Sequence, residues 1–183
     1  VYDRTITKAD PVERFVGKTC ILGLGYGTGS LKLQHTLATS QPVSVKLDIE
    51  ECDRIVDVYR DNNTSITALW READRMLDKM IEGKIKKKIK LGEHSCVHYD
   101  NDGIILPNGF RIRYPNLRRV TKDDKDDKTQ IVYDSRKGEI PIWGGAVVEN
   151  IVQALARIIV GTQMCEINHR YRVALTVHDA AVI

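Results

Sequence analysis

Residues 64–83, TSITALWREADRMLDKMIEG, carry the clearest structural signal in the chain. Their apolar side chains recur every three to four residues, which is the spacing of one face of an α-helix. Thr64 suits an N-cap, and Gly83 stands just past the expected end, where a left-handed residue commonly terminates a helix. We therefore predict a helix here with a buried apolar stripe: Ile66, Leu69, Trp70, Ala73, Met76, Leu77, Met80 and Ile81.

Upstream of this stretch the sequence predicts further helices. Asp10 followed by Pro11 is a strong helix start, and the first helix should end near Leu24, where a glycine-rich segment begins. We expect a short second helix over residues 30–37. Apolar side chains at helical spacing predict a third helix over residues 45–60.

Downstream of Gly83 the pattern changes to short strands and turns. The dipeptides Asp102-Gly103 and Asn108-Gly109 are turn signals between short apolar runs, and residues 136–138 separate another pair of strands. Residues 171–183 have the composition of an apolar strand, interrupted at His178-Asp179. Between them, Gly144-Gly145 leads into a helix with an expected core side of Val148, Ile151, Val152, Leu155, Ile158 and Ile159.

The composition is that of an ordinary globular chain. Its 183 residues are 42% hydrophobic and 29% charged, and the net charge of +3 is too small to argue for a polyanionic partner. Four scattered cysteines without a CxxC pair predict reduced thiols and a cytoplasmic protein. We expect no membrane-spanning stretch and no signal peptide. Because the chain starts at Val1 and stops at Ile183 within an apolar run, we expect both ends to be cut.

A first candidate site lies on the first helix. Arg14, Lys18, Leu22 and Tyr26 recur every fourth residue, so they form a stripe on one helix face. Two cations one turn apart can hold a triphosphate, and the residues beyond them would meet the sugar and base. The alternative is a solvated basic edge. The glycines that follow fit neither a GxGxxG register nor a Gly-Lys-Ser/Thr loop, so they predict a helix end and hinge.

A second candidate is the carboxylate of Asp179. Within an apolar strand a carboxylate is costly unless it is paired or binds a metal. A magnesium ion would take it together with a second carboxylate and substrate phosphates. The alternative, an Asp that begins a turn at a strand end, is disfavoured because the apolar run resumes at Ala180.

Four other polar groups have ordinary alternatives. Glu149, Gln153 and Arg157 form a polar helix stripe of a kind that is usually only hydrated. The lysines of residues 84–90 form either a solvated face or a sequence-independent phosphate contact. Residues 94–98 contain His and Cys but no second ligand pair, so zinc is not expected. The charged run 122–128 predicts a flexible, solvated turn.

In this order, the segments resemble family A (DNA polymerase I-like) DNA polymerases, particularly those of bacterial viruses. Residues 14–27 are similar to the fingers motif Arg-x3-Lys-x6-8-Tyr-Gly, residues 143–154 to the palm helix, and His178-Asp179 to the second palm carboxylate motif. The resemblance implies an α+β fragment of a larger polymerase domain. A helical fingers lobe over residues 1–92 would precede β-hairpins and a truncated palm over residues 93–183, with a helix on antiparallel strands.

The resemblance also implies a reaction and its residues. A primer 3′-hydroxyl would attack the α-phosphate of a dNTP, with two Mg²⁺ ions bound by Asp179 and by a carboxylate upstream of Val1. The implied partners are primer–template DNA and dNTP, with no membrane, in the cytoplasm of a host cell. The implied nucleotide-binding residues are Arg14, Lys18, Leu22, Tyr26 and Gly27; the DNA-binding residues are Glu149, Gln153 and His178; the catalytic residues are Asp179, His178 and Lys18.

Two positions depart from the family pattern. Leu22 replaces the usual Phe or Tyr beside the sugar, and Ala180 replaces the usual Glu after His-Asp. We expect the isolated chain to be poorly soluble and not to extend a primer. The alternative function is a non-catalytic nucleic-acid-binding module that uses residues 84–90 and the helix at Arg14, and is indifferent to nucleotide and magnesium. A glycine-loop nucleotide hydrolase is disfavoured because its lysine and its strand are missing.

Overall fold

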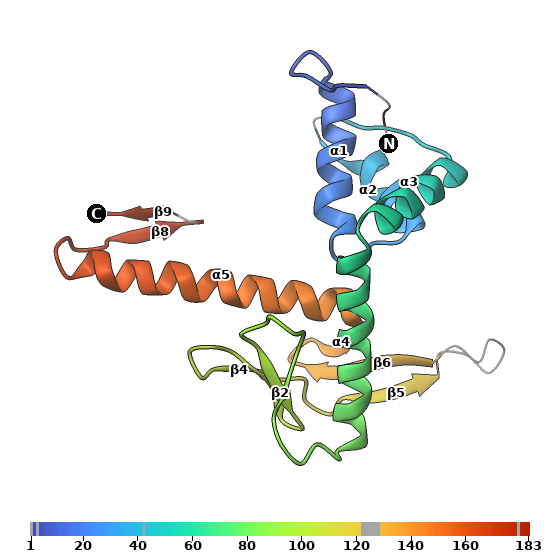
Figure 1. Ribbon diagram of the computed structural model, residues 1–183. Helices are drawn as coiled ribbons and strands as arrows, with labels where there is room; N and C mark the ends of the chain where they lie inside the picture. Colours follow the sequence, from blue (N-terminus) through green and yellow to red (C-terminus); the bar gives the residue numbers. More distant parts are fainter. Residues whose placement is uncertain (1, 3, 42, 122–128, 179) are drawn as a thin grey trace. The chain divides into compact units, whose positions relative to one another are not determined.

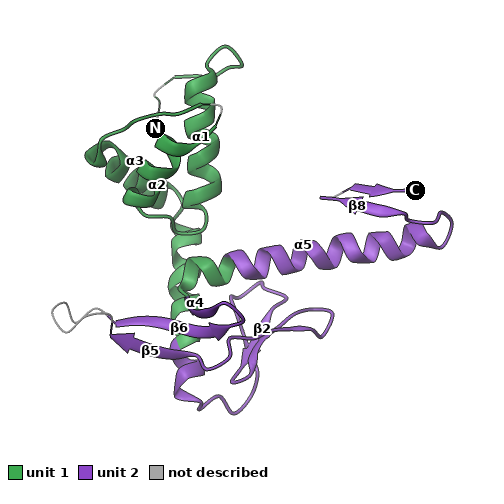
Figure 2. Ribbon diagram, turned by 180° about the vertical axis from the view of Figure 1, so that it is seen from behind, with its two compact units in different colours: residues 1–77, 142–148 green, residues 78–141, 149–183 purple. Residues whose placement is uncertain are grey.

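The structure confirms a mixed α+β fold. The computed structural model describes residues 2, 4–41, 43–121, 129–178 and 180–183. In this part of the chain five helices are joined to small antiparallel sheets of four, three and two strands. Figure 2 shows two compact units: unit 1 contains residues 1–77 and 142–148, and unit 2 contains residues 78–141 and 149–183.

Unit 1 is built around three helices, α1 (Pro11–Leu24), α2 (Ser30–Thr39) and α3 (Ile49–Asn62), which Figure 1 shows grouped together. Each helix contributes the apolar side chains of one face to a common core, and this burial is the main source of stability for helices of such length. The predicted first and second helices are thus confirmed. The core residues are Val16, Cys20, Leu24, Leu33, Leu37, Cys52, Ile55 and Val56.

The capping of α1 and the start of α3 differ from the prediction. Asp10 precedes α1, and Pro11 is its first residue, but the Asp10 carboxylate does not cap the helix. It accepts a hydrogen bond from the Thr7 N–H and pairs with Arg4, both at 2.8 Å. The third helix begins at Ile49 instead of residue 45, because the Asp48 carboxylate caps it by accepting from the Glu51 N–H at 2.8 Å.

Helix α4 (Thr64–Glu82) confirms the prediction from the opening stretch. Gly83 ends it with φ +66°, the left-handed conformation that glycine adopts without strain. Thr64 is the first helical residue and not the cap, since the Asn63 carbonyl accepts from the N–H groups of Ile66 and Thr67 at 3.1 Å. The buried residues of its stripe are Ala73, Met76, Leu77 and Met80.

Unit 2 contains the predicted hairpins. Strands β1 (Ile89–Lys90), β2 (His98–Asp100), β3 (Gly103–Ile105) and β4 (Arg111–Ile112) form one antiparallel sheet in that order. Strands β5 (Arg118–Thr121), β6 (Thr129–Ser135) and β7 (Gly138–Pro141) form a second. The expected solvated turn at residues 122–128 lies outside the described residues.

One glycine of the first sheet is required by close packing. Gly103 has φ +139°, and a Cβ at this position would lie 2.3 Å from the carbonyl oxygen of Ile112 on the neighbouring strand. Only a residue without a side chain fits both this conformation and this approach. The turn between β2 and β3 is thereby fixed.

Helix α5 (Gly144–Asn168) is less buried than expected. Val148 and Ile151 are buried as predicted, but Val152 is 46% exposed and Ile159 is 58% exposed. The predicted core side is therefore wrong for these two residues. The fully buried residues of α5 lie in its first turns, and Leu155 and Ile158 farther along are half-buried.

The expectation that no stretch reaches membrane-spanning length is also wrong for α5. In the described part of the chain, this 25-residue helix alone is long and apolar enough, with a mean hydropathy of 1.3 in a window that is 28% buried. A single helix of this kind is weak evidence for a membrane span, because core helices of globular proteins pass the same test. Its polar stripe includes Glu149, Gln153 and Arg157.

The C-terminal segment forms a hairpin and not one interrupted strand. Strand β8 (Leu175–Val177) pairs antiparallel with β9 (Ala180–Val182), and Val177 stands opposite Ala180. His178 follows β8 with φ +55°, a conformation that turns the chain back and breaks the extended run. Resumption of the apolar run at Ala180 therefore marks a returning strand. Asp179 lies outside the described residues.

Candidate nucleotide-binding site

Helix α1 presents the predicted stripe to solvent. Arg14, Lys18 and Leu22 are all exposed, and their four-residue spacing places them on one face of a regular helix. Neither cation forms an ion pair with any residue that the structure describes. The two charges are therefore available to an anionic ligand, and Leu22, 58% exposed, adds an apolar surface beside them.

The other face of α1 fixes the orientation of this stripe. Val16, Cys20 and Leu24 are buried in the three-helix core. Burial raises the pKa of the Cys20 thiol, and the neighbouring Cys52 adds to the shift. Cys20 therefore remains a neutral thiol, as a core position requires. Rotation of α1 that moved Arg14 and Lys18 would expose this apolar face, so packing holds the two cations in place.

The stripe ends at a turn that contains Tyr26 and Gly27. The N–H groups of Tyr26 and Gly27 donate to the carbonyls of Gly23 and Leu24 at 3.1 and 3.0 Å. Gly27 has φ +80°, which favours glycine and agrees with the predicted helix end. Tyr26 is half-buried, in contrast to the exposed residues of the stripe.

The segment before α5 packs against this turn within unit 1. A Cβ at Gly27 would lie 3.3 Å from Nε1 of Trp143, and a Cβ at Gly145 would lie 2.5 Å from the Tyr26 carbonyl oxygen. Two segments that carry separate sequence motifs are therefore in direct contact. Sequence reasoning missed this contact, although the Gly144-Gly145 pair is the kind of signal that marks a close backbone approach.

Asp74 of α4 anchors the same segment. Its carboxylate accepts a hydrogen bond from the Gly144 N–H at 2.5 Å, at the N-terminus of α5. A carboxylate is favourable there because the first N–H groups of a helix lack partners and carry the positive end of its dipole. A Cβ at Gly144 would lie 2.0 Å from the Trp70 carbonyl oxygen, so no larger residue fits. Asp74 was not singled out from the sequence.

The predicted DNA-facing residues belong to unit 2. Nε2 of Gln153 donates to Oε1 of Glu149 at 3.1 Å, so these two side chains form a connected polar pair on α5. Arg157 and His178 are exposed. The Glu149–Gln153 pair presents hydrogen-bonding groups but no net positive charge.

A further contact ties the start of this polar stripe to the β-structures of unit 2. Nδ2 of Asn150 donates to the Tyr114 hydroxyl at 3.1 Å, and the Tyr114 ring packs edge-on to Tyr133 with 5.1 Å between centroids. Burial raises the pKa of Tyr114 to about 12. The phenol is therefore neutral over the ordinary pH range, and its hydrogen bond fixes the position of Asn150 on α5, next to Glu149.

The described residues alone do not make a metal site. No group of three or more His, Cys, Asp or Glu side chains is arranged to hold a metal ion among them. Asp179, the predicted magnesium ligand, lies outside the described residues, and its predicted partner carboxylate would lie upstream of Val1. The magnesium prediction therefore remains untested.

An apolar hollow of about 370 Å³ opens on unit 1 between α1 and α3. Its lining includes Gly17, Ile21, Val58 and Tyr59, but none of the stripe residues Arg14, Lys18 and Leu22. The exposed stripe, and not this hollow, is thus the candidate nucleotide-binding surface.

Comparison with known proteins shows a similarity to a DNA polymerase. No protein-family model and no solved structure matches the chain. A DNA polymerase of Bacillus phage SP02 is 29% identical over 188 aligned residues, which cover 98% of this chain and 28% of the phage protein.

The chain is related to a phage DNA polymerase. The similarity extends over nearly all of the chain, but the chain spans only 28% of the length of that polymerase.

Proposed function

We propose that this chain is part of the nucleotide-binding fingers and part of the palm of a family A DNA polymerase. The observation that carries the proposal is the stripe of Arg14, Lys18 and Leu22, which α1 holds on one exposed face while its other face is buried. The similarity to a phage polymerase supports a nucleotide triphosphate as the anion that this stripe meets. On this proposal residues 1–92 belong to the fingers and residues 93–183 to the palm.

The proposed roles follow the chemistry of the side chains. Lys18 and Arg14 bind the triphosphate of an incoming dNTP, and Leu22 with Tyr26 forms a wall beside its sugar and base. Gly27 gives the turn after α1 the freedom to act as a hinge. Glu149, Gln153 and His178 contact the primer–template near its 3′ end. The reaction joins the primer 3′-hydroxyl to the α-phosphate and releases pyrophosphate.

The proposal includes magnesium held by Asp179 and a second carboxylate. Bound magnesium would neutralise the charge that develops on the phosphates. The described residues contribute in a different way from the metal. Lys18 and Arg14 hold the nucleotide, and the packed start of α5 sets the position of Tyr26. Such a protein would act in the cytoplasm of a host cell.

Primer extension tests the proposal. The reading frame that encodes these residues would be expressed whole and compared with Asp179→Asn and with a control, Asp57→Asn, at an exposed position on α3. We expect magnesium-dependent extension that Asp179→Asn abolishes and Asp57→Asn leaves intact. Extension that survives Asp179→Asn would contradict the assignment of His178-Asp179.

A non-catalytic nucleic-acid-binding module is the second candidate, and the exposed lysines of residues 84–90 favour it. This alternative predicts DNA binding that is unchanged by Asp179→Asn and indifferent to dNTP and magnesium. No extension by well-folded wild-type protein, together with such binding, would favour the module over the polymerase.

A further inference from the structure

The lysine-rich segment after α4 borders a hollow on unit 2. The hollow measures about 350 Å³, and four lysines line it: Lys79, Lys84, Lys86 and Lys87. Lys79 comes from the last turns of α4 and the others from the segment that follows Gly83. Glu82 is the one acidic side chain in the lining, so the surface carries a local excess of positive charge.

These lysines are exposed, and none of them forms an ion pair with a residue in the described ranges. Two arginines of unit 2 differ in this respect. Arg111 pairs with Asp100 at 2.6 Å, and Arg118 pairs with Asp134 at 2.8 Å and with Glu139. Protein carboxylates thus satisfy these arginines, whereas the lysines of the hollow face solvent. Their charge is available to an external anion.

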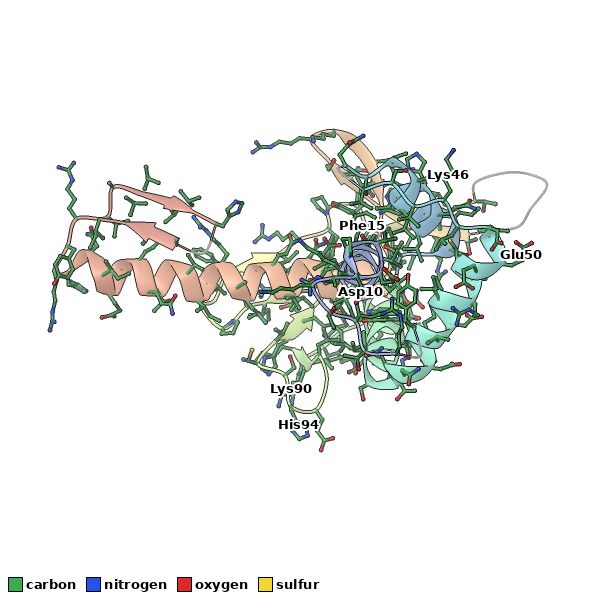
Figure 3. All side chains as sticks on the ribbon, turned by 90° about the horizontal axis from the view of Figure 1, so that it is seen from above. Asp10, Phe15, Lys46, Glu50, Lys90 and His94 are labelled. Carbon is green, nitrogen blue, oxygen red and sulfur yellow. The ribbon has the colours of Figure 1, made fainter. Side chains whose placement is uncertain are left out.

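A side-chain clamp holds the segment in place. Oδ1 of Asn101 accepts from the Ile85 N–H at 3.1 Å, and Nδ2 of Asn101 donates to the Ile85 carbonyl at 3.2 Å. The amide therefore pairs with the segment as a neighbouring strand would. Farther along, Nζ of Lys90 donates to the Glu93 carbonyl at 2.6 Å, and Figure 3 shows Lys90 close to His94 in this loop. The clamp fixes the backbone between Lys84 and Lys86.

We propose that this lysine-lined hollow binds the phosphodiester backbone of duplex DNA, at a site separate from the α1 stripe. The proposal rests on the proposed function, which places DNA beside this chain. Lysine ammonium groups bind phosphates as point charges without reading sequence. Single strands are usually bound by stacking of bases on aromatic side chains, and the lining of the hollow contains none. The chemistry therefore favours the backbone of a duplex.

The test compares two variants of equal charge. The first replaces Lys79, Lys84, Lys86 and Lys87 with Gln. The control replaces four other exposed lysines with Gln: Lys8, Lys32, Lys46 and Lys137. Binding of a labelled DNA duplex by the whole protein is followed by fluorescence anisotropy over a range of salt concentrations, without dNTP or Mg²⁺.

We expect the first variant to bind at least about tenfold more weakly and to lose about one unit of the slope of log K against log salt for each lysine that contacts a phosphate. The control should change affinity less than about threefold. Equal losses in the two variants would overturn the proposal, because they would show only a general charge effect. A larger loss for a single strand than for the duplex would also contradict it.

Asn101→Ala provides a test that leaves the charge unchanged. Loss of the clamp should weaken duplex binding severalfold, and unchanged binding would overturn the assignment of a positioned site. Since this assay contains no nucleotide and measures no extension, its failure is distinguishable from failure of the proposed polymerase activity.

Discussion

The backbone of Gly145 lies so close to Tyr26 that a Cβ at Gly145 would stand 2.5 Å from the Tyr26 carbonyl oxygen. Gly145 opens α5, and Tyr26 lies in the turn that follows α1. The two residues are distant in sequence but adjacent within unit 1. The position of Tyr26 therefore depends on the absence of a side chain at residue 145.

Gly145→Ala should move Tyr26 and destabilise the chain. The added methyl meets backbone atoms that cannot rotate away, so we expect a loss of about 1–3 kcal/mol in the free energy of unfolding, as for overpacking of a core. The control is Gly161→Ala in the same helix, where a Cβ meets nothing within 4 Å. This control should stabilise the helix by about 0.5–1 kcal/mol. Chemical denaturation measures both, and equal effects would contradict the contact.

Lys18→Ala should weaken use of dNTP by the whole protein. Loss of a charged hydrogen-bond donor to a phosphate costs about 1.5–3 kcal/mol, which corresponds to about 10- to 100-fold in kcat/KM for dNTP. Lys32→Ala on α2 removes the same charge from another exposed helix of unit 1 and should have little effect. Steady-state primer extension at varied dNTP concentration measures the difference. Equal kinetics for the two variants would remove Lys18 from the nucleotide site.

Tyr114 should make stability fall at alkaline pH. Its folded-state pKa of about 12 lies above the ordinary value of 10.0, so an unfolded chain releases the proton first as pH rises. The stabilisation is complete below pH 10 and is lost progressively up to about 12, with a magnitude of order 2 kcal/mol. Tyr114→Phe should lower stability at neutral pH, because Asn150 loses its partner, and should show a smaller alkaline decrease. Chemical denaturation at a series of pH values measures the free energy of unfolding of both proteins. If this free energy fell equally with pH in the two proteins, the account would be contradicted.

The four cysteines should separate into two classes of reactivity. Cys20 and Cys52 are buried, and burial raises the pKa of both thiols, whereas Cys96 and Cys165 are exposed. An alkylating reagent should therefore modify the exposed pair in the native protein and the buried pair only after unfolding. Mass spectrometry of labelled peptides measures the rates. Fast labelling of Cys20 would mean that the three-helix core opens readily.

The helical part of the fold was predictable because its signals are local. Pro11 marks the first residue of α1, and Gly83 ends α4 with a positive φ. The turns at Asp102-Gly103 and Asn108-Gly109 were also predictable, since these dipeptides suit tight hairpins. In each case a few adjacent residues decide the backbone conformation.

The predictions failed where contacts between distant residues, or the register of strands, determine the structure. Apolar spacing on α5 could not show that Val152 and Ile159 are exposed, because exposure depends on what packs against the helix. The interruption at His178-Asp179 was visible in the sequence, but the return of the chain as a hairpin was missed, since both strands have the same apolar composition. For the candidate site, the stripe of Arg14 and Lys18 follows from helix periodicity alone. The Gly145–Tyr26 contact does not, because it joins segments more than a hundred residues apart.

The tight approach of Gly103 to Ile112 has a consequence for how this protein tolerates mutation. The turn that Gly103 closes also carries Asn101, which holds the lysine segment through Ile85. On the proposal that this segment binds DNA, exchange of any single lysine should lower the DNA affinity only in part, since the neighbouring lysines carry the same charge. Gly103 has no such substitute. In a library of variants selected for DNA binding, position 103 should therefore be nearly invariant while the charged positions drift, although Gly103 itself need never touch DNA.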